Sequence, residues 1–183
     1  MKGHHLILGE LEDFITGEIL EDTLDERYRQ KIARMLVNEK GYAKHEIIPR
    51  KRINAEAGER KGSVTLDFRV QINGRTGMII RFGPGSLITR HRPVLAMSRL
   101  AESYQIPVAV VTNGEDADVL DGKTGEITGS GFDAIPDRAS LGKIMVSSDF
   151  EPLSPKRTEM ESRVVYCYEV DGSCPCDTDI CRL

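Results

Sequence analysis

Residues 64–72 carry the pattern that most restricts how this chain can fold. Apolar side chains alternate strictly with polar ones, and a period of two predicts a β-strand. The apolar members are Val64, Leu66, Phe68, Val70 and Ile72, and between them stand Thr65, Asp67, Arg69 and Gln71. Asn73-Gly74 follows at once and predicts a tight hairpin turn. The nearly continuous apolar run at 77–82 predicts the partner strand, in the middle of a sheet.

Three helices are expected around this hairpin. In the first, apolar side chains recur at helical spacing, Thr23 and Glu26 form a capping-box pattern before it, and Gly41 marks its end. Pro93 is expected to open the second helix, and Asp137 to cap the third. The expected ranges are residues 24–40, 93–104 and 137–146.

Shorter strands complete the expected fold. They span 45–53, which runs into a basic turn, 108–111, and a hairpin of 117–120 with 126–127. The order of elements predicts a mixed α/β fold, with α and β segments around a mixed sheet. We divide the chain into an acidic N-terminal extension at 1–22, one domain at 23–146, and a polar tail at 147–183 in which no further element is expected.

Composition excludes several classes of protein. No run of 18 apolar residues is present, which excludes a membrane-spanning helix. The first residues lack the apolar stretch of a signal peptide, so we expect a cytoplasmic protein. Tryptophan is absent and aromatic residues are 5% of the chain, which argues against a nucleic-acid binder that works by aromatic stacking.

Charge is unevenly distributed, although the net charge is only −4. Residues 1–26 carry one lysine and eight acids, and residues 27–107 carry 17 basic residues and six acids. Residues 108–183 carry seven basic residues and 15 acids. A basic middle within an acidic chain indicates an anionic partner. The alternative is that the acidic ends fold back over the middle and neutralise it.

All four cysteines lie in the tail, at Cys167, Cys174, Cys176 and Cys181. Four thiolates this close together provide the tetrahedral ligand set that Zn²⁺ takes in structural sites. The spacing lacks the paired C-x2-C knuckles of a zinc ribbon. An iron–sulfur cluster, free thiols and disulfides stay open as alternatives, with zinc ahead of iron.

Five segments of the chain occur in an order that resembles one known family. They are Glu26-Arg27-Tyr28-Arg29-Gln30, Gly41-Tyr42, Leu66-Asp67-Phe68, Ile79-Ile80-Arg81 and Val110-Val111-Thr112-Asn113-Gly114. In order and spacing they resemble the N-terminal nuclease domain of type I restriction enzyme R subunits, of the PD-(D/E)XK, or restriction-endonuclease-like, superfamily. The resemblance covers residues 22–135. It implies an αβββαβ core, DNA as the partner, and metal-dependent cleavage of the DNA backbone.

The superfamily pattern has an Asp on the second strand and a Glu-x-Lys on the third, which together support Mg²⁺-assisted attack by water on the phosphate. Asp67 matches the Asp and is the expected catalytic and metal-binding residue; the alternative is an exposed Asp paired with Arg69 or Arg75. Ile79 stands at the Glu position and Arg81 at the Lys position. Isoleucine cannot ligate a cation, and arginine is too basic to accept a proton. The catalytic motif is therefore degenerate.

Two further acids are candidates to replace the missing ligand. Glu26 matches the family's helix Glu and is a candidate to reach the metal or position water, whereas a plain capping box is the alternative. Glu102, on the second helix, is a candidate for a migrated metal ligand, with an ordinary solvated position as the alternative.

Basic clusters are expected to contact DNA phosphates, which gives affinity without choice of sequence. The expected DNA-binding residues are Arg90, His91, Arg92, Arg99, Arg50, Lys51 and Arg52.

Three functions are compatible with these residues. The first, which we favour, is a DNA-binding module of the nuclease fold with a degenerate catalytic site. The second is an active Mg²⁺-dependent endonuclease that uses Asp67 with Glu26 or Glu102. The third is a protein-interaction module, and partner proteins and a homodimer stay open. Under the first, we expect Arg81 to pair with Asp67 in the space of the metal rather than to face outward and clamp a phosphate.

Overall fold

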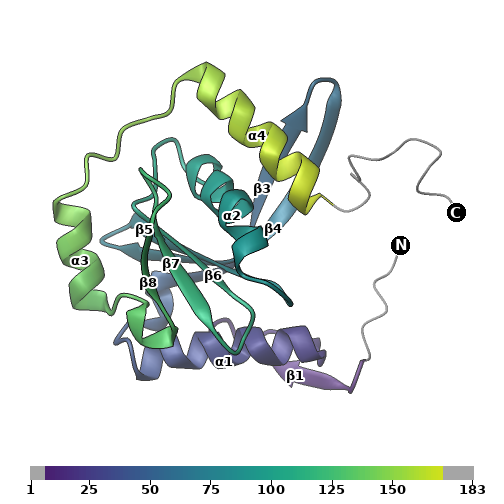
Figure 1. Cartoon of the computed structure of the whole chain (residues 1–183). Helices are drawn as coiled ribbons and strands as arrows, with labels where there is room; N and C mark the ends of the chain where they lie inside the picture. Colours follow the sequence, from purple (N-terminus) through teal and green to yellow (C-terminus); the bar gives the residue numbers. More distant parts are fainter. Residues whose placement is uncertain (1–6, 171–183) are drawn as a thin grey trace, which may run out of the picture.

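A computed structural model describes residues 7–170 and has a three-layer α/β architecture (Figure 1). The middle layer is a six-stranded sheet of order β3-β4-β5-β6-β7-β8. Its strands are β3 (Ile47–Ala57), β4 (Arg60–Ile72), β5 (Arg75–Phe82), β6 (Val108–Thr112), β7 (Ala117–Asp121) and β8 (Ile127–Ser130). β5 and β6 run parallel, and each other neighbouring pair is antiparallel. A separate small sheet pairs β1 (Glu10–Glu12) with β2 (Ile19–Glu21). The expected mixed α/β fold is confirmed.

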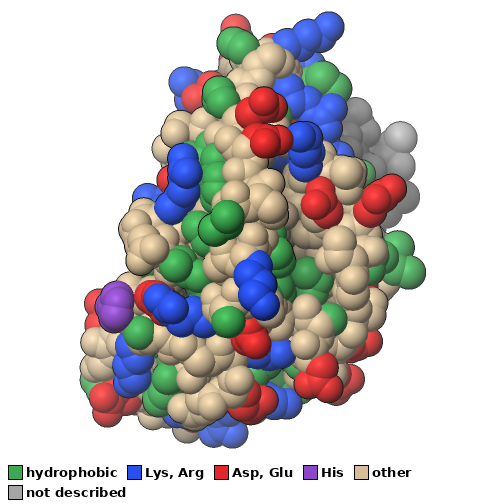
Figure 2. Space-filling view, turned by 90° about the vertical axis from the view of Figure 1, so that its left-hand side faces the viewer, with side chains coloured by type: hydrophobic (Ala, Val, Ile, Leu, Met, Phe, Trp, Pro, Cys, Tyr) green, Lys and Arg blue, Asp and Glu red, His purple; other side chains and the backbone are tan. Residues whose placement is uncertain are grey.

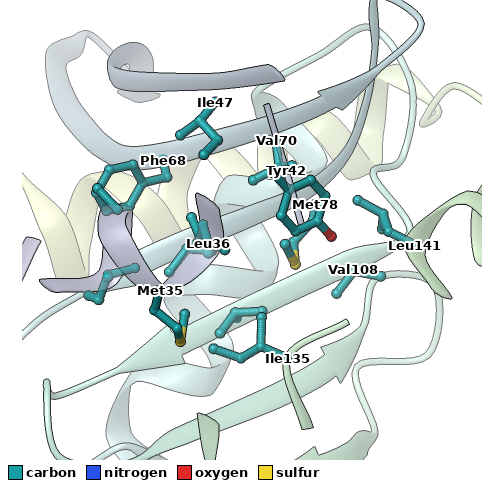
Figure 3. Close-up of a cluster of buried hydrophobic side chains, with 14 of the residues drawn as sticks. Met35, Leu36, Tyr42, Ile47, Phe68, Val70, Met78, Val108, Ile135 and Leu141 are labelled. Carbon is teal, nitrogen blue, oxygen red and sulfur yellow. The ribbon is translucent and has the colours of Figure 1, made fainter. Parts of the chain in front are cut away.

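Helices cover both faces of the six-stranded sheet. On one face lie α1 (Leu24–Asn38) and α3 (Arg138–Val146), and on the other lie α2 (Ile88–Leu100) and α4 (Pro155–Glu169). Short 3-10 turns, η1 (Lys44–Glu46) and η2 (Phe132–Ala134), lie in the connections. Figure 3 shows the core on the α1 face, where Met35 and Leu36 of α1 pack toward Phe68 and Met78 of the sheet. Within residues 7–170 no helix has the length and apolarity needed to cross a membrane.

Asn73 and Gly74 form the predicted turn between β4 and β5. Both have positive φ angles, 52° and 76°, as a type I′ turn requires, and Ile72 lies opposite Arg75. β5 lies between β4 and β6, and its residues from Thr76 to Ile80 are buried. The prediction of a central strand is therefore confirmed.

β3 and β4 extend past the rest of the sheet as a two-stranded arm, residues 51–66 (Figure 1). The apolar side chains of β4 change face at its base. Leu66 packs into the core beneath α2 and α4, whereas Phe68 packs into the α1 core. On the neighbouring strand β3, Arg50 lies between the residues that pair with Leu66 and Phe68. Its φ of 54° is outside the β region. The continuous alternation in the sequence therefore serves two cores, and Asp67 lies where the strand changes from one to the other.

Several element boundaries differ from the sequence prediction, and because α2 ends at Leu100, Glu102 lies after the helix on which it was expected. α2 begins at Ile88, so Pro93 lies inside the helix and not at its start. The proline removes one intrahelical hydrogen bond, but residues 93–99 are all buried, and this packing stabilises the helix. The basic residues 50–52, expected at a turn, lie within β3, which continues to Ala57 because its pairing with β4 continues.

Residues 155–169 form helix α4, where no element was expected from the sequence. Ser154 caps it by accepting a hydrogen bond from the Arg157 N–H, and Pro155 occupies the first turn, where its missing N–H is not needed. The buried residues of α4 are Glu161 and Val165. A helix whose buried face includes a glutamate has no clear apolar period, which explains why the sequence pattern gave no sign of it.

Candidate functional site

Asp67, the expected catalytic carboxylate, is 3% exposed. Its Oδ1 accepts a hydrogen bond from Arg29 Nε of α1 at 2.5 Å. Its Oδ2 accepts from Arg81 Nη1 at 2.9 Å and from the backbone N–H of Phe82 at 2.8 Å. A buried carboxylate is tolerated when it is paired and hydrogen-bonded, and here both oxygens are engaged. Two guanidinium groups therefore lie against the carboxylate that a metal ion would need.

Arg81 reaches Asp67 across the β4–β5 hairpin, as predicted. A register shift in this hairpin sets Phe68 opposite Ile80, and the same register sets Asp67 opposite Arg81. Through Nε and Nη2 the Arg81 guanidinium also donates to Glu169 Oε2, at 3.1 and 2.8 Å. Burial, the largest influence, opposes the positive charge, but Asp67 and Glu169 outweigh it and raise the pKa of Arg81. Arg81 therefore stays charged and links the sheet to α4.

Glu26, the second expected catalytic acid, lies near the same arginine of α1. Thr23 caps α1 as predicted, since its Oγ1 accepts from the Glu26 N–H at 3.1 Å. The Glu26 carboxylate accepts from Gln30 Nε2 at 2.9 Å and from Arg29 Nη1 at 3.4 Å. One guanidinium thus joins Glu26 to Asp67, the two acids that the resemblance assigns to the catalytic site.

Asp13, before α1, extends this network. Its Oδ2 accepts from Gln30 Nε2 at 3.0 Å and from Arg50 Nη1 at 2.8 Å, and its Oδ1 accepts from the backbone N–H groups of Ile15 and Thr16. Burial, the largest influence, favours the neutral acid, but these donors outweigh it and lower the pKa of Asp13 to about 2. Part of the acidic N-terminal segment is thereby held against α1 and β3.

The residues around Asp67 do not fit a magnesium ion. Ile79, at the position of the superfamily's Glu, is fully buried in the core beneath α2 and α4. Glu102, the candidate metal ligand, pairs with Arg69 and accepts from Thr76 Oγ1 at 2.7 Å. Arg69, one alternative partner for Asp67, is therefore bound to Glu102 instead. Mg²⁺ requires oxygen ligands, and within residues 7–170 no three His, Cys, Asp or Glu side chains are grouped as a metal site.

The basic residues of α2, all expected to bind DNA, have internal partners. Arg92 and Arg99 pair with Glu161 of α4, Arg90 donates to the Pro84 carbonyl, and His91 Nε2 lies 2.8 Å from Asp118 Oδ2. Arg99 is 6% exposed, which leaves little of it for a ligand. The Arg92 side chain is 43% exposed, so Arg92 can still contact one.

The expected cluster at 50–52 divides in the same way. Arg50 is engaged by Asp13, whereas Lys51 and Arg52 are exposed on the arm. Arg60 and Lys61, at the far end of the arm, are exposed as well. The arm therefore carries four exposed cations and two exposed acids, Glu56 and Glu59, which leaves it with a net positive charge.

The face that carries α3 shows no comparable basic cluster. Figure 2 shows this face, and its Lys and Arg side chains are interspersed with Asp and Glu side chains. Charges of both signs at close spacing give little net attraction for a polyanion.

Of the four cysteines proposed to bind zinc, Cys167 falls within the described residues and is exposed on α4. Cys174, Cys176 and Cys181 lie outside the described residues. The zinc site therefore stays a prediction.

Four residues that organise these contacts were not assigned a role from the sequence: Asp13, Arg29, Glu161 and Glu169. A local signal exists for Arg29, which follows Glu26 by three residues and so shares its helix face. Glu161 binds a residue 62 positions away, and Glu169 one 88 positions away. No local pattern spans such separations.

Comparison with known proteins gives one family match. The model of the type I restriction enzyme R protein N terminus matches residues 24–136, more than half of the chain. The matched range contains the six-stranded sheet and the Asp67 contacts with Arg29 and Arg81, and it ends before α3 and α4. Searches of curated proteins and of solved structures gave no match.

Proposed function

The chain belongs to the family of type I restriction enzyme R protein N termini, and we propose that it is a DNA-binding module in which ion pairs replace the cleavage site. The observation that carries this proposal is the division of its cations. Arg29 and Arg81 are bound to Asp67, and Arg92 and Arg99 of α2 are bound to Glu161. The lysines and arginines of the arm are exposed.

The arm is suited to contact a polyanion. Lys51, Arg52, Arg60 and Lys61 lie on one two-stranded ribbon, one face of which is covered by α4. Exposed lysines and arginines on such a surface can contact DNA phosphates without reading the bases. Lys61 Nζ lies 3.1 Å from Glu56, but both side chains are more than half exposed. Exposed pairs of this type are weak, so a phosphate can displace the glutamate.

Cleavage is not supported by the surroundings of Asp67. A metal ion would have to displace Arg29 and Arg81 from a carboxylate that is already hydrogen-bonded by the Phe82 N–H. The position of the superfamily's Glu would still supply only the hydrocarbon side chain of Ile79. We therefore propose a module that binds DNA without Mg²⁺-dependent hydrolysis.

Fluorescence anisotropy with a labelled duplex over a range of salt concentrations tests DNA binding. Each lost phosphate contact lowers the slope of log affinity against log salt by about 1, so Lys51→Ala with Arg52→Ala should lower it by about 2. Lys31→Ala with Lys143→Ala is the matched control, because it removes two exposed charges outside the arm. Equal effects of the two double variants, or no binding at low salt, would contradict the proposal.

A plasmid-nicking assay with Mg²⁺ or Mn²⁺ tests the absence of cleavage. We expect no nicking that depends on Asp67. Nicking by the parent that is lost in Asp67→Asn would overturn this part and favour the endonuclease alternative, with Glu26 or Glu102 as the second acid.

A further inference from the structure

Three arginines converge on one buried glutamate where α2 meets α4. Glu161 is 0% exposed. Arg99 Nη1 lies 2.9 Å and Arg157 Nε lies 2.7 Å from its Oε1, and Arg92 Nη1 lies 2.6 Å from its Oε2. Three positive charges thus meet one negative charge.

No other acid compensates for this excess within residues 7–170. Ion-pair contacts of Arg92, Arg99 and Arg157 there are all with Glu161. Two buried atoms of the cluster, Arg99 Nε and Glu161 Oε2, have no hydrogen-bond partner there, and the contact of Arg92 with Oε2 is an ion pair. Burial, the largest cause, together with the charges of Arg157 and Arg92, lowers the pKa of Arg99 in spite of Glu161. An additional anion would relieve this repulsion.

The beginning of α4 adds to the positive potential. Its first turn contains Lys156 and Arg157 and no acid, although the N-terminal end of a helix favours negative charge. Guanidinium groups are donors that bind phosphate in proteins. In the first turn Pro155 has no N–H and Ser154 accepts from the N–H groups of Arg157 and Thr158, which leaves the Lys156 N–H to donate to a ligand. The side chains of Arg92 and Arg157 are 43% and 45% exposed, so an anion from solvent can reach both.

We propose that Arg92 and Arg157, which meet at Glu161, form a phosphate-binding site beside the first turn of α4. Glu161 holds the two guanidinium groups in place, and buried Arg99 adds positive charge behind them. The ligand is a phosphate group, either free or carried by a nucleic acid. The site uses no residue of the arm, so it does not depend on the proposed function.

Titration calorimetry with sodium phosphate, against sodium chloride at equal ionic strength, tests the site. We expect the parent to bind phosphate and both Arg92→Gln and Arg157→Gln to bind it about tenfold more weakly, the effect of losing one charge-assisted hydrogen bond. Arg163→Gln is the matched control, because Arg163 lies on the same helix and pairs with an acid four residues away, Glu159. Its affinity should equal that of the parent.

Thermal unfolding in chloride shows whether each variant is folded. If Arg92→Gln does not fold, Arg157→Gln, whose side chain lies near the surface, decides the question. Failure of the parent to bind phosphate, or equal affinities of Arg157→Gln and Arg163→Gln, would overturn the site.

Two oligonucleotides of one sequence, with and without a 5′-phosphate, distinguish the sources of the ligand. Binding that needs the terminal phosphate and is weakened by Arg157→Gln assigns a terminal or free phosphate. Equal binding of both, weakened by Arg157→Gln, assigns the phosphates of the backbone. In either case Lys51→Ala with Arg52→Ala should leave the titration with inorganic phosphate unchanged, so this site and the arm can fail separately.

Discussion

Replacing Arg81 by methionine removes one guanidinium from between two buried carboxylates. The side chains of Asp67 and Glu169 are 3% and 4% exposed. Asp67 keeps its hydrogen bonds from Arg29 and from the Phe82 N–H, whereas Glu169 loses the two hydrogen bonds that Arg81 donates to it. Removing one partner of a buried pair costs about 3–5 kcal/mol. We expect a loss of that size, most of it due to Glu169.

Urea denaturation followed by circular dichroism measures this loss. With a slope of about 1–3 kcal/mol per molar urea, the midpoint should fall by about 2 M. Arg29→Met is the matched control, because Asp67 then keeps Arg81 and Glu26 keeps Gln30. Since no carboxylate loses all its donors, we expect this control to lose about 1–2 kcal/mol.

Double variants apportion the loss between the two acids. In the Arg81→Met background, Glu169→Gln should recover more stability than Asp67→Asn. An Arg81→Met variant that unfolds at the same urea concentration as the parent would refute the reasoning from buried pairs. Equal losses in Arg81→Met and Arg29→Met would contradict the part assigned to Glu169.

Four further substitutions test the fold. The pKa of Asp13 is lowered to about 2 in the folded protein, so ionised Asp13 stabilises the fold fully above its unfolded pKa of about 3.9 and this contribution is lost as pH falls toward 2. When the free energy of unfolding is measured as a function of pH, the parent should lose about 2 kcal/mol on acidification that Asp13→Asn does not lose. A Cβ at Gly122 would lie 1.9 Å from the Ile106 carbonyl oxygen, so Gly122→Ala should lower the thermal midpoint, whereas Gly142→Ala in α3, with open space around it, should add about 1 kcal/mol. Val165→Ala should cost about 2 kcal/mol in urea, and no change would show that α4 is not docked.

The elements that could be predicted from the sequence depend on residues close together in it. Asn73-Gly74 fixes the β4–β5 hairpin through its two positive φ angles. Thr23 caps α1, and Asp137 caps α3 by accepting from the Ser140 N–H. The Asp67–Arg81 pair was predictable because the turn places their strands side by side. The register shift that aligns the two residues has no signature in the alternating pattern.

Helix α4 and its contacts could not be predicted in this way. Its stability depends on Val165, which packs into the core shared with α2, and on Glu161 and Glu169, whose partners lie far away in the sequence. A buried glutamate in a sequence looks like an exposed one until its arginines are known. The same reason explains why Glu26 and Glu102 were proposed as magnesium ligands. Each is bound to an arginine, Arg29 and Arg69 respectively, that the sequence did not identify as its partner.

The acidic ends of the chain neutralise part of its basic middle, and this separates stability from binding. Arg50 is paired with Asp13 near the N-terminus, and Arg81 and Arg99 are paired with acids of α4. Each of these pairs includes a buried carboxylate, so loss of the arginine is expected to destabilise the fold. Lys51 and Arg52 are exposed on the arm, and surface charges of this kind contribute little to stability. Substitutions on the arm should therefore change affinity for DNA with little change in the free energy of unfolding, and substitutions of Arg50 and Arg81 should do the reverse.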